Sequence, residues 1–220
     1  MQLNIQTTTN TGVAAKFLAS KILEQLKSGK NVLWFVPGGS AITVAVETAR
    51  TISKYPHKNL TVIMADERYG PVGHQNSNWQ QIQEHGFNLP QSKLIPILTG
   101  EDLIATTKNF NTILREELAK ANYKIGLFGV GANAHTGGIM PKSDAVNSSD
   151  LAHRYKAKQF ERITITPKTI IQLDEAVVFM QGKEKWWVLQ DLEKDIPVFD
   201  EPAQVLKKIP LLTIFTDYKK

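Results

Sequence analysis

Short runs of β-branched and aromatic residues alternate with longer segments of helical periodicity along most of this chain. The apolar runs cover residues 32–36, 60–64, 125–128, 163–165, 176–180 and 211–215. The segments with helical spacing cover residues 11–28, 41–53, 103–121 and 183–194. The runs are continuous rather than alternating, as strands buried on both faces tend to be, and the helical segments are long enough to connect parallel strands. The alternation therefore predicts an α/β fold with a mostly parallel, twisted sheet flanked by helices.

The size and composition of the chain suit one domain with its own core. It has 220 residues, of which 42% are hydrophobic, and a chain of this length buries a large share of its surface on folding. Neither an internal repeat nor a Ser/Gly-rich linker interrupts the sequence. We therefore expect a single domain over residues 1–220. The absence of cysteine excludes disulfides, thiolate metal sites and a cysteine nucleophile.

The charge balance gives a mild preference for anionic ligands. The net charge is +5, but Lys and Arg occur singly or in pairs such as Lys207-Lys208, without the long basic block of a nucleic-acid surface. No apolar run approaches the roughly 20 residues of a membrane span, and the N-terminus lacks the pattern of a signal peptide. We expect a cytoplasmic protein with neither nucleic acid nor membrane as a partner. The sequence makes no prediction of its oligomeric state.

The first motif that can carry chemistry is Pro37-Gly38-Gly39-Ser40, directly after the run at 32–36. Paired glycines allow a sharp turn and a close approach to a ligand, and the start of the following helix offers free N–H groups to an anion. The alternative is a turn that uses glycine for packing alone. The spacing matches neither the Walker loop nor the dinucleotide fingerprint, so the motif favours a phosphate group over a nucleotide.

The second motif is Asp66-Glu67-Arg68, at the end of the strand that begins at residue 60, followed by Ser77-Asn78. Two carboxylates and a guanidinium can supply a proton acceptor, an orienting acid and an anion clamp. The alternative is a charged loop with local ion pairs.

The third motif is a glycine-rich segment, residues 129–138, which contains His135. An imidazole in such a loop can act as a base near neutral pH, whereas a lone loop histidine is otherwise structural or simply exposed. The remaining histidines lack the spacing of metal ligands, and no metal site is predicted. Residues 131–160 show little regular pattern, so we expect a long loop that faces the substrate. All three motifs follow predicted strands, at the sheet edge where open parallel sheets bind ligands.

In this order and spacing, the motifs resemble the 6-phosphogluconolactonase and glucosamine-6-phosphate isomerase/deaminase family over nearly the whole chain. Gly38-Gly39-Ser40 is similar to the family's phosphate loop, and Asp66-Glu67-Arg68 with Ser77-Asn78 is similar to its lactonase form. Two further segments resemble its Arg-[Ile/Leu]-Thr strand and its Gly-x-x-Lys motif, namely Arg162-Ile163-Thr164-Ile165-Thr166 and Gly182-Lys183-Glu184-Lys185. The resemblance implies a Rossmann-like fold of the glucosamine-6-phosphate deaminase type.

The resemblance also implies an activity: hydrolysis of 6-phosphogluconolactone to 6-phosphogluconate, a step of the pentose phosphate pathway, without metal or organic cofactor. A small sugar phosphate is the implied partner. The implied phosphate-binding residues are Gly38, Gly39, Ser40, Arg162 and Lys185. The implied catalytic residues are His135, Asn133, Asp66 and Arg68. In this scheme His135 is the general base on water, Arg68 steadies the oxyanion or the sugar hydroxyls, and Asp66 matches the acid that moves a C2 proton in the deaminases.

Residues 131–141 depart from the lactonase pattern Gly-x-Asp-Gly-His-Thr-Ala-Ser-Leu-Phe-Pro. Asn133 replaces the acid, and Ala134 replaces the following glycine. An amide keeps a hydrogen bond to the imidazole but loses most of the electrostatic stabilisation of an imidazolium, and alanine is disfavoured where φ is positive. Two alternatives therefore stay open: an amino-sugar-phosphate isomerase or deaminase that uses Asp66 as the C2 base, and a sugar-phosphate sensor without turnover.

Overall fold

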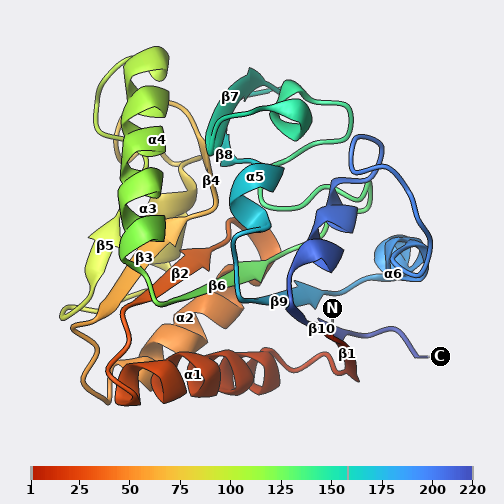
Figure 1. Ribbon diagram of the computed structural model, residues 1–220, viewed down its shortest axis with the longest axis horizontal. Helices are drawn as coiled ribbons and strands as arrows, with labels where there is room; N and C mark the ends of the chain where they lie inside the picture. The colour runs from red at the N-terminus through yellow and green to blue at the C-terminus, as the bar shows by residue number, and fades with distance from the viewer. Residues whose placement is uncertain (1, 158, 220) are drawn as a thin grey trace.

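A parallel sheet forms the centre of the molecule in the computed structural model, which describes residues 2–157 and 159–219. Its seven strands within these residues are β1 (Gln2–Thr7), β2 (Val32–Val36), β3 (Leu60–Met64), β5 (Lys93–Ile95), β6 (Tyr123–Phe128), β9 (Glu175–Met180) and β10 (Leu211–Thr216). They lie in the order β1-β10-β9-β6-β2-β3-β5, and each neighbouring pair is parallel (Figure 1). The predicted parallel α/β sheet is confirmed, and every predicted strand except 163–165 belongs to it.

Helices cover both faces of this sheet. They are α1 (Thr11–Lys27), α2 (Ile42–Ile52), α3 (Asn78–Glu84), α4 (Leu103–Lys120), α5 (Pro167–Ile170) and α6 (Trp186–Asp191). Short 3-10 segments occupy Gly39–Ala41, Asp144–Asn147, Lys183–Lys185 and Pro202–Lys208. In Figure 1, α1 and α2 lie together below the sheet, and α3 and α4 lie above it. Within the described residues, no helix combines the length and the apolar character needed to cross a membrane.

The start, the buried face and the end of helix α1 each follow from particular residues. The side chain of Asn10 caps the helix by accepting a hydrogen bond from the backbone N–H of Gly12 at 2.8 Å. Ala14, Leu18 and Ile22 are spaced four residues apart and are fully buried against the sheet and α2. After the helix, Gly29 takes a φ of 78°, which glycine adopts without strain.

A second, smaller sheet stands beside the central one. It contains β4 (Asp66–Arg68), β8 (Glu161–Ile165) and β7 (Ala152–Lys156) in the order β4-β8-β7, and both pairings are antiparallel. The predicted strand at 163–165 therefore exists, but its assignment to the parallel sheet is wrong. All three residues are fully buried, as in the central strands. The sequence pattern alone therefore could not show to which of the two sheets this strand belongs.

Two further predictions need correction. The stretch 131–160, predicted as one loop, contains β7 and the 3-10 turn Asp144–Asn147. Burial alternates along β7, whose outward side chains are polar, so the strand lacks the apolar run that marks the central strands. The predicted helix 183–194 is shorter: a 3-10 turn at Lys183–Lys185 leads into α6, which ends at Asp191.

The strand order reverses beside β2. The chain passes outward from β2 to β3 and β5, and then returns through α4 to β6, on the other side of β2. At such a switch point the loops after the two strands separate and leave a crevice at the carboxyl ends, which is the usual ligand site of open parallel sheets. The turn that follows β2 and the loop that follows β6 carry the first and third motifs.

Candidate active site

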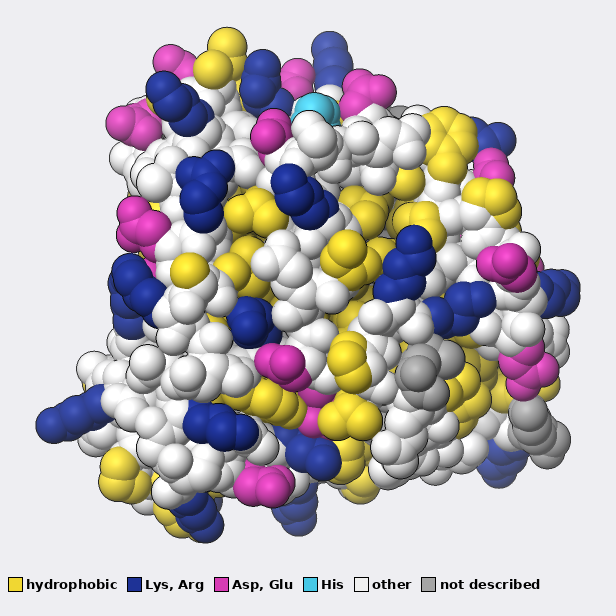
Figure 2. Space-filling model, viewed as in Figure 1, with side chains coloured by type: hydrophobic (Ala, Val, Ile, Leu, Met, Phe, Trp, Pro, Cys, Tyr) yellow, Lys and Arg dark blue, Asp and Glu magenta, His cyan; other side chains and the backbone are white. Residues whose placement is uncertain are grey.

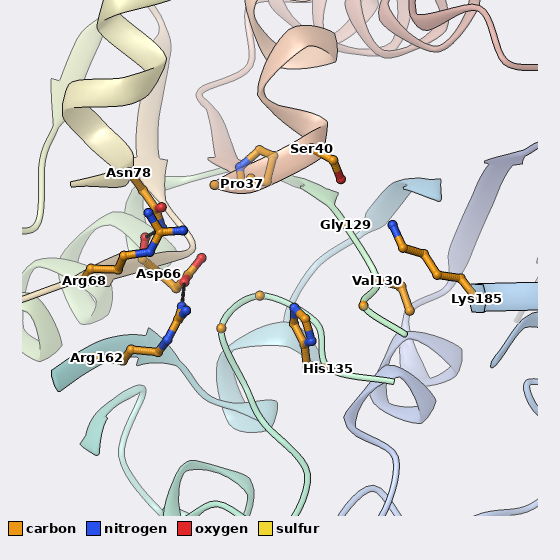
Figure 3. A pocket seen from close by; sticks show the side chains of 15 residues that line it. Pro37, Ser40, Asp66, Arg68, Asn78, Gly129, Val130, His135, Arg162 and Lys185 are labelled. Atoms are coloured by element: carbon orange, nitrogen blue, oxygen red, sulfur yellow. Dashed lines mark hydrogen bonds and ion pairs between the residues drawn. The ribbon is translucent and has the colours of Figure 1, made fainter. Parts of the chain in front are cut away.

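A cavity of about 300 Å³ opens at this switch point. It is lined by Pro37, Gly38, Gly39, Ser40, Asp66, Arg68, Asn78, Gly129, Val130, Gly131, His135, Gly137, Gly138, Arg162 and Lys185 (Figure 3). Every predicted site residue except Asn133 therefore contributes to one pocket. Asn133 lines the neighbouring cavity and reaches the site through its hydrogen bond to His135.

The turn after β2 forms one wall of the pocket and leads into α2. Gly39 has a φ of 67°, and the chain then enters the 3-10 turn Gly39–Ala41. Gly38 is required by a close approach, because a Cβ there would lie 2.4 Å from Cγ of Asn78. The first N–H groups of a helical segment have no acceptor within it, and they attract anions. Ser40 is exposed beside them and faces the pocket (Figure 3).

Asp66 and Arg162 form an ion pair in the pocket wall. They come from the neighbouring strands β4 and β8, and Nη1 of Arg162 lies 3.0 Å from Oδ2 of Asp66. Only 6% of Asp66 is exposed. Burial raises the pKa of Asp66, and the positive charge of Arg162 acts in the opposite direction. Gly138 of the His135 loop presses against Asp66, since a Cβ at Gly138 would lie 2.4 Å from Cβ of Asp66.

Arg68 extends beside Asp66 toward the pocket (Figure 3). Its Nη1 donates a hydrogen bond to the backbone carbonyl of Asn76 at 2.9 Å, and its guanidinium lies 5.6 Å from the ring centre of Phe160. Because this acceptor is a neutral carbonyl and not a carboxylate, it does not neutralise the guanidinium, whose positive charge can interact with an anion in the pocket.

Glu67 points away from the pocket and organises the wall behind it. Its fully buried carboxylate accepts hydrogen bonds from the backbone N–H groups of Arg68, Asn78 and Trp79 and from the hydroxyl of Ser77, at 2.6 to 3.0 Å. Burial raises the pKa of Glu67, and these hydrogen bonds act against that rise. Glu67 therefore ties β4 to the start of α3 and is a structural residue.

We expect the substitution Glu67→Gln to destabilise the protein by roughly 2–4 kcal/mol, because an amide offers one acceptor where four donors converge and places its NH₂ against the others. Denaturant unfolding measures this loss. Glu84→Gln is the matched control, since the carboxylate of Glu84 is exposed and accepts a hydrogen bond from the side chain of Gln80. Equal losses in the two variants would contradict the role given to Glu67.

His135 and Asn133 form a dyad whose geometry fixes the state of the imidazole. Oδ1 of Asn133 lies 2.5 Å from Nδ1 of His135 and 3.4 Å from the backbone nitrogen of His135. An amide oxygen only accepts, so Nδ1 carries the proton and Nε2 keeps its lone pair. Burial lowers the pKa of His135, with smaller contributions in the same direction from Arg162 and Lys185, while Asp66 opposes them. His135 is thus a neutral base near physiological pH.

The backbone of the His135 loop is held by the second sheet. The hydroxyl of Tyr155 on β7 donates to the carbonyl of Gly138 at 2.5 Å, and the hydroxyl of Thr164 on β8 donates to the carbonyl of Gly137. Neither positioning residue was predicted from the sequence, because nothing in a strand sequence reveals which hydroxyl meets a distant carbonyl. Ala134 is fully buried and has a φ of 61°, as expected for a position where the lactonase pattern has glycine.

Lys185 approaches the pocket from the side opposite Arg68 (Figure 3). It lies on the turn after β9, which Asp217 braces through hydrogen bonds from the backbone N–H of Gly182 at 3.1 Å and from Nε1 of Trp186 at 2.9 Å. Three cationic side chains, those of Arg68, Arg162 and Lys185, thus surround one carboxylate in the pocket. This balance suits an anionic ligand. In residues 2–157 and 159–219, His, Asp and Glu form no cluster of three that could hold a metal ion.

The sequence of this chain is similar to those of known sugar-phosphate enzymes. The sequence signature described as glucosamine-6-phosphate isomerases/6-phosphogluconolactonase matches residues 8–212. A 6-phosphogluconolactonase of Thermotoga maritima is 23% identical over 193 residues, which cover 83% of this chain and 86% of the relative. A glucosamine-6-phosphate deaminase of Oenococcus oeni is 25% identical over 226 residues, with 94% of this chain and 93% of the relative covered.

The fold has solved counterparts as well. The crystal structure of the Thermotoga maritima 6-phosphogluconolactonase superposes with a TM-score of 0.82 at 19% identity, and the match covers 98% of this chain and 99% of the other. With the signature spanning nearly the whole sequence and the fold shared end to end, this chain belongs to the glucosamine-6-phosphate isomerase/6-phosphogluconolactonase family.

Proposed function

We propose that this protein hydrolyses 6-phosphogluconolactone to 6-phosphogluconate. The observation that carries the proposal is the Asn133–His135 dyad, which presents a neutral imidazole base in a pocket with an excess of positive charge. The 6-phosphogluconolactonase of Thermotoga maritima supports the choice of substrate.

The phosphate group binds where the pocket offers unpaired N–H groups and cations. We assign it to the turn at Gly38, Gly39 and Ser40 and to the side chains of Arg162 and Lys185, which line the same cavity. Helix N–H groups and charge-assisted hydrogen bonds are the contacts that proteins use for phosphate. Anchoring the phosphate fixes the lactone ring near His135.

The chemical step is a general-base hydrolysis. Nε2 of His135 takes a proton from water as the water oxygen attacks C1, and the oxyanion formed on the carbonyl oxygen is stabilised by Arg68. The bond between C1 and the ring oxygen then breaks, and His135 returns its proton to that oxygen, which becomes a hydroxyl. The new carboxylic acid loses its proton at neutral pH. Asp66 holds Arg162 in place during this sequence.

A second candidate, isomerisation or deamination of an amino-sugar phosphate, is favoured by one observation: Asp66 is a buried acid with a raised pKa in the pocket wall. Its ion pair with Arg162 occupies the carboxylate that such a reaction needs as a base. Parallel assays with 6-phosphogluconolactone and glucosamine 6-phosphate decide between the two. Acid release from the lactone alone supports our proposal, ammonia release alone supports the second candidate, and binding without turnover supports a sensor.

The dyad predicts a specific pH dependence. His135 acts as a base in its neutral form, and its pKa lies below the usual 6.5. We therefore expect kcat/KM to stay constant as the pH falls to 6.5 and to decline only at lower pH. Asn133→Asp places a carboxylate beside Nδ1, which raises the pKa of His135 and moves the decline to higher pH. Titration of the His135 ring protons by NMR measures both pKa values. An unchanged or lower pKa in Asn133→Asp would contradict the dyad.

A further inference from the structure

A second cavity of about 990 Å³ adjoins the active-site pocket. It lies between the segment from Met140 to Asp144 and the hairpin formed by β7 and β8. Arg68 and Arg162 line both cavities, and Asn133 lines the second while it bonds to His135 in the first. The second cavity therefore begins where the lactone bond breaks. We call it the side chamber.

The side chamber is positively charged. Among the lining residues that the structure describes, the cations are Arg68, Lys142, Lys156 and Arg162, and the one acid is Asp144. Lys142 and Lys156 belong to the side chamber alone, so their charges do not act in the active-site pocket through direct contact. An excess of cations around a partly enclosed space favours an anionic ligand.

These two lysines are weakly engaged elsewhere. Nζ of Lys142 lies 3.9 Å from the carboxylate of Asp200, at the outer limit of an ion pair, and both side chains are about half exposed or more. Lys156 lies opposite Glu161 in the register of β7 and β8, but among the described residues no ion pair joins the two side chains. Lys142 also has a φ of 60°, a conformation that costs energy for a residue other than glycine, and its backbone N–H is held by the carbonyl of Phe199 at 2.8 Å.

Hydrolysis creates a group that such a chamber can receive. The substrate is a compact ring in which the phosphate is the anion, whereas the product is an open chain with a second anion, the carboxylate at C1. The active-site pocket, at about 300 Å³, is at the small end of ligand cavities, and the phosphate end of the chain stays beside Lys185. C1 lies at the His135 and Arg68 side, which borders the side chamber.

We propose that the side chamber binds the C1 carboxylate of the open-chain sugar acid phosphate, with Lys142 and Lys156 as its contacts. This inference rests on the proposed lactonase function and adds a product subsite to it. The chamber then draws the carboxylate away from His135 after ring opening, and it makes the protein prefer an acyclic sugar acid phosphate over an acyclic sugar alcohol phosphate.

Calorimetric titration with two ligands tests this proposal. One is 6-phosphogluconate, and the other is glucitol 6-phosphate, an open-chain phosphate with a hydroxymethyl group in place of the carboxylate. We expect the double variant Lys142→Gln/Lys156→Gln to raise the Kd of 6-phosphogluconate roughly 3- to 20-fold and to leave that of glucitol 6-phosphate within about 2-fold. Lys30→Gln/Lys54→Gln, with the same charge change on exposed residues outside both cavities, is the matched control.

A variant that is expected to tighten binding distinguishes a loss of charge from a loss of folded structure. Asp144→Asn removes the one acid of the side chamber and should tighten 6-phosphogluconate binding about 2-fold, which misfolding cannot do. An unchanged Kd for 6-phosphogluconate in both variants would overturn the side-chamber proposal and leave the lactonase proposal standing. Equal weakening of both ligands would overturn the carboxylate assignment. If neither ligand binds to the unaltered protein, the side-chamber proposal fails, and the rate of lactone hydrolysis by the same protein decides whether the proposed function fails with it.

Discussion

His135→Gln is expected to lower kcat for lactone hydrolysis about 10²- to 10⁴-fold, with KM changed much less. Glutamine fills a similar volume and can still hydrogen bond, but it cannot take a proton from water or return one to the ring oxygen. The proposed phosphate contacts at Ser40 and Lys185, which line the same cavity, are unchanged, so we expect binding to survive while chemistry is lost. Steady-state kinetics with freshly prepared 6-phosphogluconolactone measure the two parameters.

His85→Gln is the matched control for this substitution. His85 is exposed at the end of α3, and its Nδ1 lies 2.7 Å from the carbonyl of Gln81, away from the pocket. It should retain full activity. If His135→Gln folded normally and turned over as fast as His85→Gln, His135 would not be the base.

The second large effect is expected from Gly131→Ala. A Cβ at Gly131 would lie 2.0 Å from Cε1 and 2.1 Å from Nδ1 of His135, closer than any real contact allows. The ring must therefore move and lose its hydrogen bond to Asn133, which sets the tautomer. Because misplacement of a catalytic group by about 1 Å costs on the order of 10²-fold, we expect kcat to fall by about that factor.

Gly129→Ala separates this effect from a general loss of loop flexibility. The Cβ it introduces would meet only Cβ of Ala41, at 4.0 Å, an ordinary contact distance. The same kinetic assay, with thermal unfolding alongside, should show a large drop in kcat for Gly131→Ala and a small one for Gly129→Ala. Similar kcat values in the two variants would mean that the position of the His135 ring does not limit the reaction.

The central sheet was predictable because its strands are buried on both faces. All five residues of β2 are buried, and so are all six of β9, in which an apolar run follows Glu175. The edge strand β1 has no buried residue, and the strand β7 of the second sheet has one, Ala152, so neither carries such a run. Neither strand was therefore predicted, and the region around β7 was predicted to be a loop.

The site was predictable where its residues follow strand ends. The carboxyl ends of β2, β3 and β6 meet at the switch point, which brings Ser40, Asp66 and His135 into one pocket. The contacts that position them were not predictable, because Tyr155 and Thr164 reach the His135 loop from 17 and 27 residues away in sequence. The different roles of the adjacent acids Asp66 and Glu67 were not predictable either. Asp66 faces the pocket, whereas Glu67 points into the protein interior.

Asn133 stands where the lactonase pattern has an acid, and the structure shows what the amide does at this position. Its amide oxygen holds Nδ1 of His135 at 2.5 Å and so retains the tautomer that a base requires. The imidazolium formed in the proposed reaction lacks an adjacent carboxylate, and the acid whose charge favours it is Asp66. We infer that the dyad preserves the geometry of the base and gives up part of its electrostatic support.

Catalysis of lactone hydrolysis by this pocket is measured directly as proton release from freshly generated 6-phosphogluconolactone in a weakly buffered solution. Each turnover yields one carboxylate and one proton. We predict a rate that rises linearly with protein concentration well above the spontaneous hydrolysis of the same lactone. A rate equal to the spontaneous one at every protein concentration would contradict the account.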